Sequence, residues 1–429
     1  MLSMQFLLAQ GLRPEPVFGL LALLAALIVG GCAATMERNP VPAGFVDSLP
    51  QVHRIKGGRT WGDETPVDIR AEMKKHLLNM PQLARDAPVV GGRKQIEILA
   101  LSGGGPDGAF GAGVLTGWTA RGDRPEFELV TGVSAGAIIA PFAFLGPDYD
   151  RQLEEVWTRY ETRQLVTAQF LPGLLGGAAL ADTAPLRELI SKYIDAAFLR
   201  KVAAEYRRGR ILSIGTTNLD ARRPVVWNMG EIALAANQQA VELFRDVILA
   251  SASIPGLFPP VNINVMVDGK PYEELHVDGG VTRQVFVAPL NVPYRMFDQF
   301  YGRAPHRTLY IIQNGKLTAH YEPVKEQTIP IAASSISTLL TSQNKGDLYR
   351  IYRMSLDAEV GFNMLMVPDD FELRPKQVFD PEYQRALFDV GRRIGQSGGP
   401  WLKVPPDTAV AQPSPGGGAS PKPAIARNP

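Results

Sequence analysis

Three glycine-containing strings of this chain carry residue types that can perform acyl-transfer chemistry. They are SGGGPDG at Ser102–Gly108, TGVSAG at Thr131–Gly136 and VDGG at Val277–Gly280. Glycine amides can bind an oxyanion, a serine hydroxyl can act as a nucleophile, and an aspartate can supply an acid group. The combination predicts one site of the serine acyl hydrolase kind that works without a histidine.

The second string places Ser134 in a G-x-S-x-G pattern, Gly132–Gly136, between an expected strand, Phe127–Thr131, and an expected helix, Ala135–Leu145. This is the setting of a nucleophile elbow, in which a sharp turn exposes the serine at the carboxyl end of a strand. The alternative is a packed turn of small residues. Three apolar side chains of the helix are expected in the core rather than in an acyl-binding pocket: Ile138, Ile139 and Phe142.

The first string lies ahead of an expected helix, where consecutive glycines can present backbone N–H groups to an anion. Its G-x-G-x-x-G spacing, residues 103–108, also matches a dinucleotide-binding fingerprint. That fingerprint requires an acidic residue at the end of the next strand. Here the next strand leads into Ser134 instead, so we expect no nicotinamide or flavin cofactor.

Asp278 follows an expected strand and precedes two glycines, which is typical of a site acid and equally of an ordinary turn. A triad of the α/β-hydrolase type would need a histidine later in the chain, and only His306 and His320 qualify. Neither has a site-like sequence context. His276 alternates with Asp278 on one strand face, and we expect a structural role for it. The remaining histidines precede the serine: His53 and His76.

The elements around these strings alternate between strands and helices, which predicts an α/β domain with a largely parallel central sheet. The expected strands are Ile96–Leu101, Phe127–Thr131, Arg210–Thr216, Pro224–Trp227, Ile263–Val267, Tyr272–Val277, Thr308–Gln313 and Val360–Val367. The expected helices are Asp68–Leu78, Gly108–Ala120, Ala135–Leu145, Asp148–Tyr160, Pro185–Tyr206, Gln238–Ser251, Glu326–Tyr352 (allowing a break near Gly346) and Pro381–Ile394.

The order of these motifs resembles the patatin-like phospholipase family. The resemblance rests on the glycine-rich loop at 103–108, G-x-S-x-G at 132–136 and D-G-G at 278–280. The segment Ala250–Pro260 (ASASIPGLFPP) also resembles the family's sequence ahead of the aspartate. The similar region spans about Ile96 to Thr282.

This resemblance implies a three-layer α/β fold, a largely parallel central sheet flanked by helices, and hydrolysis of a lipid or ester substrate. It implies Ser134 as the nucleophile and Asp278 as its proton acceptor, with neither cofactor nor metal. Pro106 has no N–H, so the expected oxyanion donors are Gly103, Gly104 and Gly105.

One position departs from the family pattern, because Asp107 stands where the loop usually carries Arg or Lys. The backbone donors survive this change, but a positive side chain that could assist a phosphate does not. Phospholipid as the substrate is therefore left open. Two other functions remain: a catalytically silent lipoprotein with a binding or envelope role, and a hydrolase that uses His306 or His320.

Composition limits the other classes of function. The 429 residues include 44 Lys+Arg and 43 Asp+Glu, a net charge of +1 that gives no electrostatic case for binding nucleic acid. Cys32 is the single cysteine, which excludes an internal disulfide and a cysteine-rich metal site.

The amino-terminal sequence predicts targeting to a membrane. Arg13 precedes an apolar run, Val17–Val29, and the small residues before Cys32 resemble a bacterial lipobox. The expected product is a lipoprotein attached through Cys32, and Ala33 after it favours the outer membrane of a Gram-negative cell. The alternative is an uncleaved helical anchor. We therefore expect a signal peptide at 1–31, a tether at 32–62, a catalytic domain at 63–403 and a disordered tail at 404–429.

Overall fold

A computed structural model describes residues 38–52, 55, 58–64, 74–165, 167–168, 181–287, 294–318, 321 and 323–406. The expected signal peptide, Cys32 and nearly all of the expected tail lie outside these residues, so those expectations remain predictions. No helix within the described ranges has both the length and the apolar character that crossing a bilayer requires.

The described part of the chain is built around a sheet whose central strands run parallel. Their order is β7, β4, β3, β11 and β12. The bounds are β3 Arg93–Leu101, β4 Leu129–Gly132, β7 Ile211–Asn218, β11 His306–Gln313 and β12 Val360–Met366. The carboxyl ends of these strands share one edge of the sheet. The prediction of an α/β fold with a largely parallel central sheet is confirmed.

Antiparallel strands extend this sheet on the β7 side. β8 and β10 each pair with β7, β1 pairs with β8, and β9 pairs with β10. Their bounds are β1 Arg59–Trp61, β8 Arg223–Asn228, β9 Val261–Val267 and β10 Lys270–Asp278. Short strands complete the set: β2 Val89–Val90, β5 Thr167–Ala168 and β6 Ala181–Asp182.

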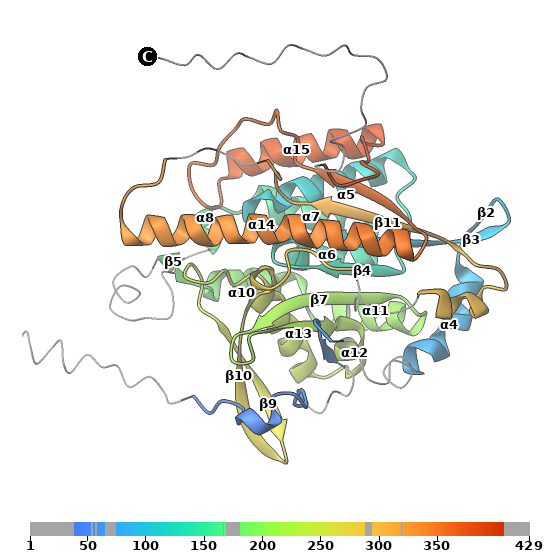
Figure 1. Cartoon of the computed structure of the whole chain (residues 1–429), viewed down its shortest axis with the longest axis horizontal. Coiled ribbons are helices and arrows are strands. Elements are labelled where there is room, and N and C mark those ends of the chain that lie inside the picture. Colours follow the sequence, from blue (N-terminus) through green and yellow to red (C-terminus); the bar gives the residue numbers. More distant parts are fainter. Residues whose placement is uncertain are drawn as a thin grey trace, which may run out of the picture.

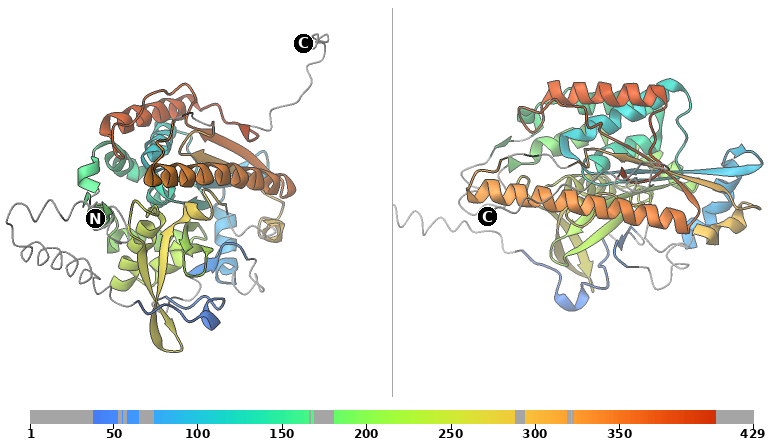
Figure 2. Two further views of the ribbon diagram at one scale, coloured as in Figure 1. Left: turned by 60° about the vertical axis from the view of Figure 1, so that its left-hand side comes forward. Right: turned by 45° about the horizontal axis from the view of Figure 1, so that its top comes forward.

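Helices cover both faces of the sheet (Figures 1 and 2). On one face lies α14, Thr328–Asp357, whose Leu348 and Ile351 pack with Ile98 and Ile311 of the strands. The helices of the other core cluster include α5 Gly108–Arg121, α6 Ala135–Leu145, α7 Asp150–Thr158, α13 Gln238–Ser251 and α15 Pro381–Ser397. The remaining described α-helices are α4 Lys74–Asp86, α8 Thr162–Leu165, α10 Ala184–Tyr193, α11 Ala196–Arg207 and α12 Met229–Leu234.

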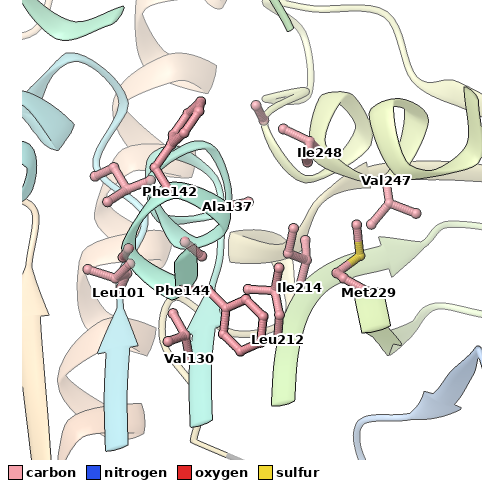
Figure 3. Packing of buried hydrophobic residues seen from close by; sticks show 14 of the residues in the cluster. Leu101, Val130, Ala137, Phe142, Phe144, Leu212, Ile214, Met229, Val247 and Ile248 are labelled. Atoms are coloured by element: carbon pink, nitrogen blue, oxygen red, sulfur yellow. The ribbon is translucent and has the colours of Figure 1, made fainter. Parts of the chain in front are cut away.

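The larger core cluster joins α6 and α13 to the strands beneath them. Figure 3 shows Phe142 and Phe144 of α6, Leu212 and Ile214 of β7 and Ile248 of α13 in this cluster. This packing fixes the β4–α6 junction, which carries Ser134.

Three helix predictions differ from the structure. The helix expected at Asp68–Leu78 continues, as α4, to Asp86. The helix expected at Pro185–Tyr206 is two helices, because Ile194 adopts an extended conformation and the Asp195 side chain caps α11 by accepting a hydrogen bond from Phe198 N at 2.7 Å. α14 is continuous through Gly346, where a break was allowed. In contrast, α13 spans the expected residues, Gln238–Ser251.

The described residues of the expected tether, 32–62, pack on the domain. Arg59–Trp61 forms a strand beside β8, and Val52 and Trp61 are buried. The Arg59 guanidinium forms a buried ion pair with Glu274 of β10. The tether prediction failed here because polar, Pro/Gly-containing sequence gives no sign of a single edge strand that a distant carboxylate holds in place.

Candidate active site

Ser134 occupies the sharp turn between β4 and α6. It has φ 54° and ψ −122°. Non-glycine residues rarely adopt a positive φ, so this conformation indicates a strained functional turn. Flanking glycines make the turn possible. A Cβ on Gly132 would lie 2.3 Å from the Gly136 oxygen, and one on Gly136 would lie 2.3 Å from the Leu101 oxygen. The elbow predicted from G-x-S-x-G is therefore present in the backbone.

A buried serine holds this turn from the side of α13. The Ser134 amide donates a hydrogen bond to Ser251 Oγ at 3.0 Å, and the Ser251 hydroxyl donates to the Gly215 oxygen at 2.6 Å. Ser251 thus ties the elbow to β7. Sequence reasoning did not assign it a role, although it lies in the Ala250–Pro260 segment that carried part of the resemblance.

Asp278 is the last residue of β10 and lies beside Ser134. The Ser134 side chain interacts with its carboxylate and lowers its pKa. Oδ1 of Asp278 accepts a hydrogen bond from Gly280 N at 2.7 Å, and the Asp278 amide donates to the Ser253 oxygen at 2.9 Å. The structure therefore brings together the two side chains that the sequence analysis paired.

The electrostatic setting of Asp278 makes it a stronger base than a solvated carboxylate. Its residue exposure is only 5%, and that of Ser134 is 6%. Burial raises the pKa of Asp278 from 3.8 to about 7, although Ser134 and the hydrogen bond from Gly280 lower it. A pKa near neutrality is what a general base at physiological pH requires.

The glycine-rich loop follows β3 and contacts the elbow. The Gly103 amide donates a hydrogen bond to the Gln284 oxygen at 3.0 Å. It is therefore not available to an oxyanion, and the prediction of Gly103 as an oxyanion donor is wrong. For the amides of Gly104, Gly105 and Ala135, no hydrogen-bond acceptor occurs among the described residues. Ala135, the residue after the serine, was not predicted as a donor. Its position in a G-x-S-x-G elbow was the signal that could have identified it.

Asn314, directly after β11, holds the loop in place. Its amide donates to Ser102 Oγ at 2.8 Å and its Nδ2 donates to the Ser102 oxygen at 2.8 Å. Its Oδ1 accepts from Gly111 N of α5 at 3.1 Å. The loop passes so close that a Cβ on Gly104 would lie 1.8 Å from the Asn314 oxygen. Position 104 therefore requires glycine.

Asp107, the acidic residue that departs from the family pattern in the loop, forms its hydrogen bond with α15 and not with Ser134. The Tyr383 hydroxyl of α15 donates to Asp107 Oδ1 at 2.6 Å. Burial raises the pKa of Asp107 to about 6, while the Tyr383 bond and the charge of Lys316 lower it. The loop consequently carries a carboxyl group whose charge changes in the mildly acidic range.

An apolar cavity of about 770 Å³, including its open mouth, extends from the site. Gly105, Ser134 and Ala135 line one end. The rest of the wall comes from α6, α7, α10, α13, the loop after α13, and Phe379 and Gln384 around the start of α15. Its apolar side chains include Ile138, Phe142, Trp157, Leu189, Ile248 and Phe258. Ile138 and Phe142 were expected only in the core, but they form cavity wall. Ile139 is fully buried, as expected.

Neither of the two histidines whose side chains the structure describes is hydrogen-bonded to Ser134 or Asp278. His276 is fully buried, with Nδ1 paired to Thr216 Oγ1 at 2.9 Å and Nε2 to Glu274 Oε2 at 3.1 Å. Both ring nitrogens are thus engaged in a structural network. His306 begins β11 opposite Gln95, at the amino edge of the sheet, whereas Ser134 lies at the carboxyl edge.

Other histidines and metal ligands add little to this picture. His53, His320 and the side chain of His76 lie outside the described residues. Among the groups that the structure describes, no cluster of three or more His, Cys, Asp or Glu side chains is placed to hold a metal ion.

Comparison with known proteins gives one family similarity. The family model for patatin-like phospholipase matches residues 99–291. No curated protein sequence matches the chain. The crystal structure of VipD from Legionella pneumophila aligns at 14% identity with a TM-score of 0.35, covering 71% of this chain and 66% of VipD. That likeness is too weak to carry an argument. The similarity to patatin-like phospholipases thus rests on the matched stretch, which contains the glycine-rich loop, Ser134 and Asp278.

Proposed function

We propose that this protein hydrolyses acyl esters of lipids through a Ser134–Asp278 dyad and a covalent acyl-enzyme. One observation carries the proposal: the serine on the strained elbow interacts with a buried carboxylate at the end of an apolar cavity. The family match of residues 99–291 supports lipid hydrolysis in general.

In the acylation step, Ser134 Oγ attacks the ester carbonyl carbon while its proton passes to Asp278. The carbonyl oxygen becomes an oxyanion, and the amides of Gly104, Gly105 and Ala135 supply its hydrogen bonds. Collapse of the tetrahedral intermediate expels the alcohol, which takes the proton back from Asp278. Removal of one oxyanion donor typically costs about 3–4 kcal/mol of transition-state stabilisation.

In the deacylation step, the roles repeat with water in place of serine. Asp278 accepts a proton from the water that attacks the acyl carbon, and Ser134 Oγ leaves and recovers that proton. The free fatty acid then departs. The single carboxylate suffices for both steps because its pKa of about 7 lets it alternate between the two protonation states at neutral pH.

The substrate is read mainly through its acyl part. The cavity wall is apolar, as a hydrocarbon chain requires, and burial of each CH₂ is worth about 0.8 kcal/mol. Asp107 offers an anionic headgroup no positive partner in the loop, and its own charge opposes one. We therefore infer that neutral long-chain esters are better substrates than phosphate-bearing ones.

We also propose that the chain is an envelope lipoprotein, attached through Cys32 to the outer membrane of a Gram-negative cell. The support is the apolar run Val17–Val29 followed by the only cysteine. Expression with a radiolabelled fatty acid tests this: label is expected in the wild type and absent from Cys32→Ala. Equal labelling of both would refute the attachment site.

The hydrolase proposal is tested with Ser134→Ala. The variant should fold, since Ala removes only the hydroxyl, and should lose at least about a thousandfold in kcat/KM on p-nitrophenyl esters. His306→Ala is the matched control, and its activity should equal that of the wild type. Unchanged turnover in Ser134→Ala, or loss in His306→Ala, would contradict the dyad. An inactive wild type with intact fold would favour the silent binding role.

A further inference from the structure

The amino-terminal half of α14 is a helix with almost no protein around it. Ile331, Ile336 and Leu339 are 49%, 40% and 69% exposed. No charged residue occurs from Gln327 to Asn344. A solvent-facing helix normally carries charged side chains on its free side, so an uncharged one with exposed aliphatic residues indicates contact with something apolar.

Most apolar residues of this half-helix gather on one face, whereas Ile331 lies on the opposite face. Ala333, Ile336 and Leu340 recur at helical spacing, with Leu339 beside them, and Ser334 and Thr338 lie on the opposite face. Hydroxyls on the other faces are partly satisfied by the helix itself. Thr338 Oγ1 donates to the Ser334 oxygen at 2.8 Å, and a second threonine one turn later makes the same type of bond. Internal pairing lowers the cost of moving hydroxyls away from water.

This half-helix projects from the edge of the sheet that carries the site. α14 connects β11 to the parallel strand β12, so it runs antiparallel to both and its beginning lies beyond their carboxyl ends (Figures 1 and 2). Its middle is fixed to the active-site loops: Asp347 Oδ2 accepts from Gln284 N at 2.9 Å, and Gln343 donates to the Thr282 oxygen. Gln284 in turn accepts from Gly103.

The amino-terminal end of the described chain reaches the same edge. β10 pairs with β7 only through 276–278, so the rest of the β9–β10 hairpin extends past the carboxyl end of β7. Arg38 binds Asp220 at 2.6 Å, and Asn39 accepts from Glu273 N at 2.8 Å, which fixes the entering chain to this hairpin. Cys32 precedes Arg38 by six residues, a span of at most about 20 Å.

We propose that the amino-terminal half of α14 docks in the plane of a lipid bilayer surface and turns the Ser134 edge toward it. The occupant is the membrane rather than a protein, because the anchor expected at Cys32 would hold this same edge close to a bilayer. The helix lies on the bilayer, as amphipathic helices do, and does not span it. Docking therefore supplies orientation, which a flexible acyl anchor alone does not give.

The first test reads the helix locally. In a full-length Cys32→Ala background, Ile336→Cys or Thr338→Cys provides a single thiol for the fluorophore NBD. Diether phosphatidylcholine vesicles are added, because the enzyme cannot hydrolyse them. We expect a blue shift and about a twofold or greater rise in emission for the label at 336, since transfer to an apolar phase removes water from it. The label at 338, on the opposite face, should change much less.

Two results would overturn the docking. One is no change at 336, or equal changes at both positions. The other is a blue shift at 336 that needs no vesicles and grows with protein concentration, which would assign the face to a second copy of the chain. Both readings are independent of catalysis, so they stand even if the hydrolase proposal fails.

The second test joins docking to turnover. Ile336→Glu combined with Leu339→Glu charges the apolar face, and Ser334→Glu combined with Thr338→Glu is the matched control on the far face. The first pair should lower hydrolysis of a long-chain ester in vesicles about tenfold or more. It should leave a soluble short-chain ester unaffected, and the control should change neither. Equal vesicle activity in both pairs would refute the proposal, whereas absence of all hydrolysis in the wild type would refute only the hydrolase function.

Discussion

Replacement of the buried carboxylate, Asp278→Asn, should remove activity and at the same time stabilise the fold above neutral pH. The pKa of Asp278 is about 7 in the folded protein against 3.8 for the free side chain, because burial disfavours its charge. The folded chain therefore holds a proton between about pH 4 and 7 that the unfolded chain has released. In this window a rise in pH destabilises the fold. Each pH unit costs about 1.4 kcal/mol.

The full shift of about three units corresponds to about 4 kcal/mol, all of which is present above pH 7. Asn carries no charge and can still accept the hydrogen bond from Gly280. The free energy of unfolding of wild type and Asp278→Asn is measured with guanidinium at pH 5 and pH 8. Relative to the variant, the wild type should lose about 3 kcal/mol between these two values.

The activity of the wild type should change with pH in the opposite direction to its stability. Only ionised Asp278 can accept the serine proton, so wild-type kcat/KM should rise with pH and level off above about 7. Asp278→Asn should be inactive across the range. A stability difference that does not depend on pH, or that favours the wild type at pH 8, would show that the carboxylate is not held in a charge-disfavouring site.

Three further substitutions test the loop and the cavity. In Gly104→Ala, the added methyl group would lie 1.8 Å from the Asn314 oxygen and would displace the loop. The value of kcat/KM should therefore fall by about a hundredfold or more, and the unfolding midpoint should drop. Near-normal kinetics would exclude the loop as the oxyanion site. Asp107→Asn removes a negative charge that forms above about pH 6. The ratio of variant to wild-type kcat/KM should therefore rise from near one at pH 5 to a few-fold at pH 8. A ratio that does not change with pH would show that Asp107 does not influence the oxyanion. Ile138→Trp fills part of the cavity, so the preference for a twelve-carbon over a four-carbon ester should fall about tenfold, whereas an unchanged preference would place the acyl chain elsewhere.

The elements around the site were predictable because their signals are local. The periodicity of Gln238–Ser251 identified α13 with both ends, and short apolar runs located β3, β4, β7, β11 and β12. G-x-S-x-G identified the elbow, since only glycine fits at 132 and 136, where an added Cβ would lie 2.3 Å from a backbone oxygen. The pairing of Ser134 with Asp278 came from family resemblance, because no local pattern reveals which acid of a chain reaches a serine 144 residues away.

The features that were missed depend on contacts between distant segments. The strand Arg59–Trp61 forms because it pairs with β8 and because Arg59 forms an ion pair with Glu274. Gly103 was wrongly predicted as an oxyanion donor because its amide is hydrogen-bonded to the Gln284 oxygen, on another loop. Ile138 and Phe142 carry the same apolar character as core residues, and only the arrangement of α6, α10 and α13 leaves open space beside them. Such outcomes are set by tertiary packing, which a single sequence does not display.

The central claim, a serine activated by one carboxylate, is tested most directly by a fluorophosphonate probe that phosphonylates active-site serines. We expect one adduct per chain, located on Ser134 by peptide mass spectrometry, that forms faster as pH rises through about 7 and is lost in Asp278→Asn. An adduct on another residue, or none on folded protein, would contradict it.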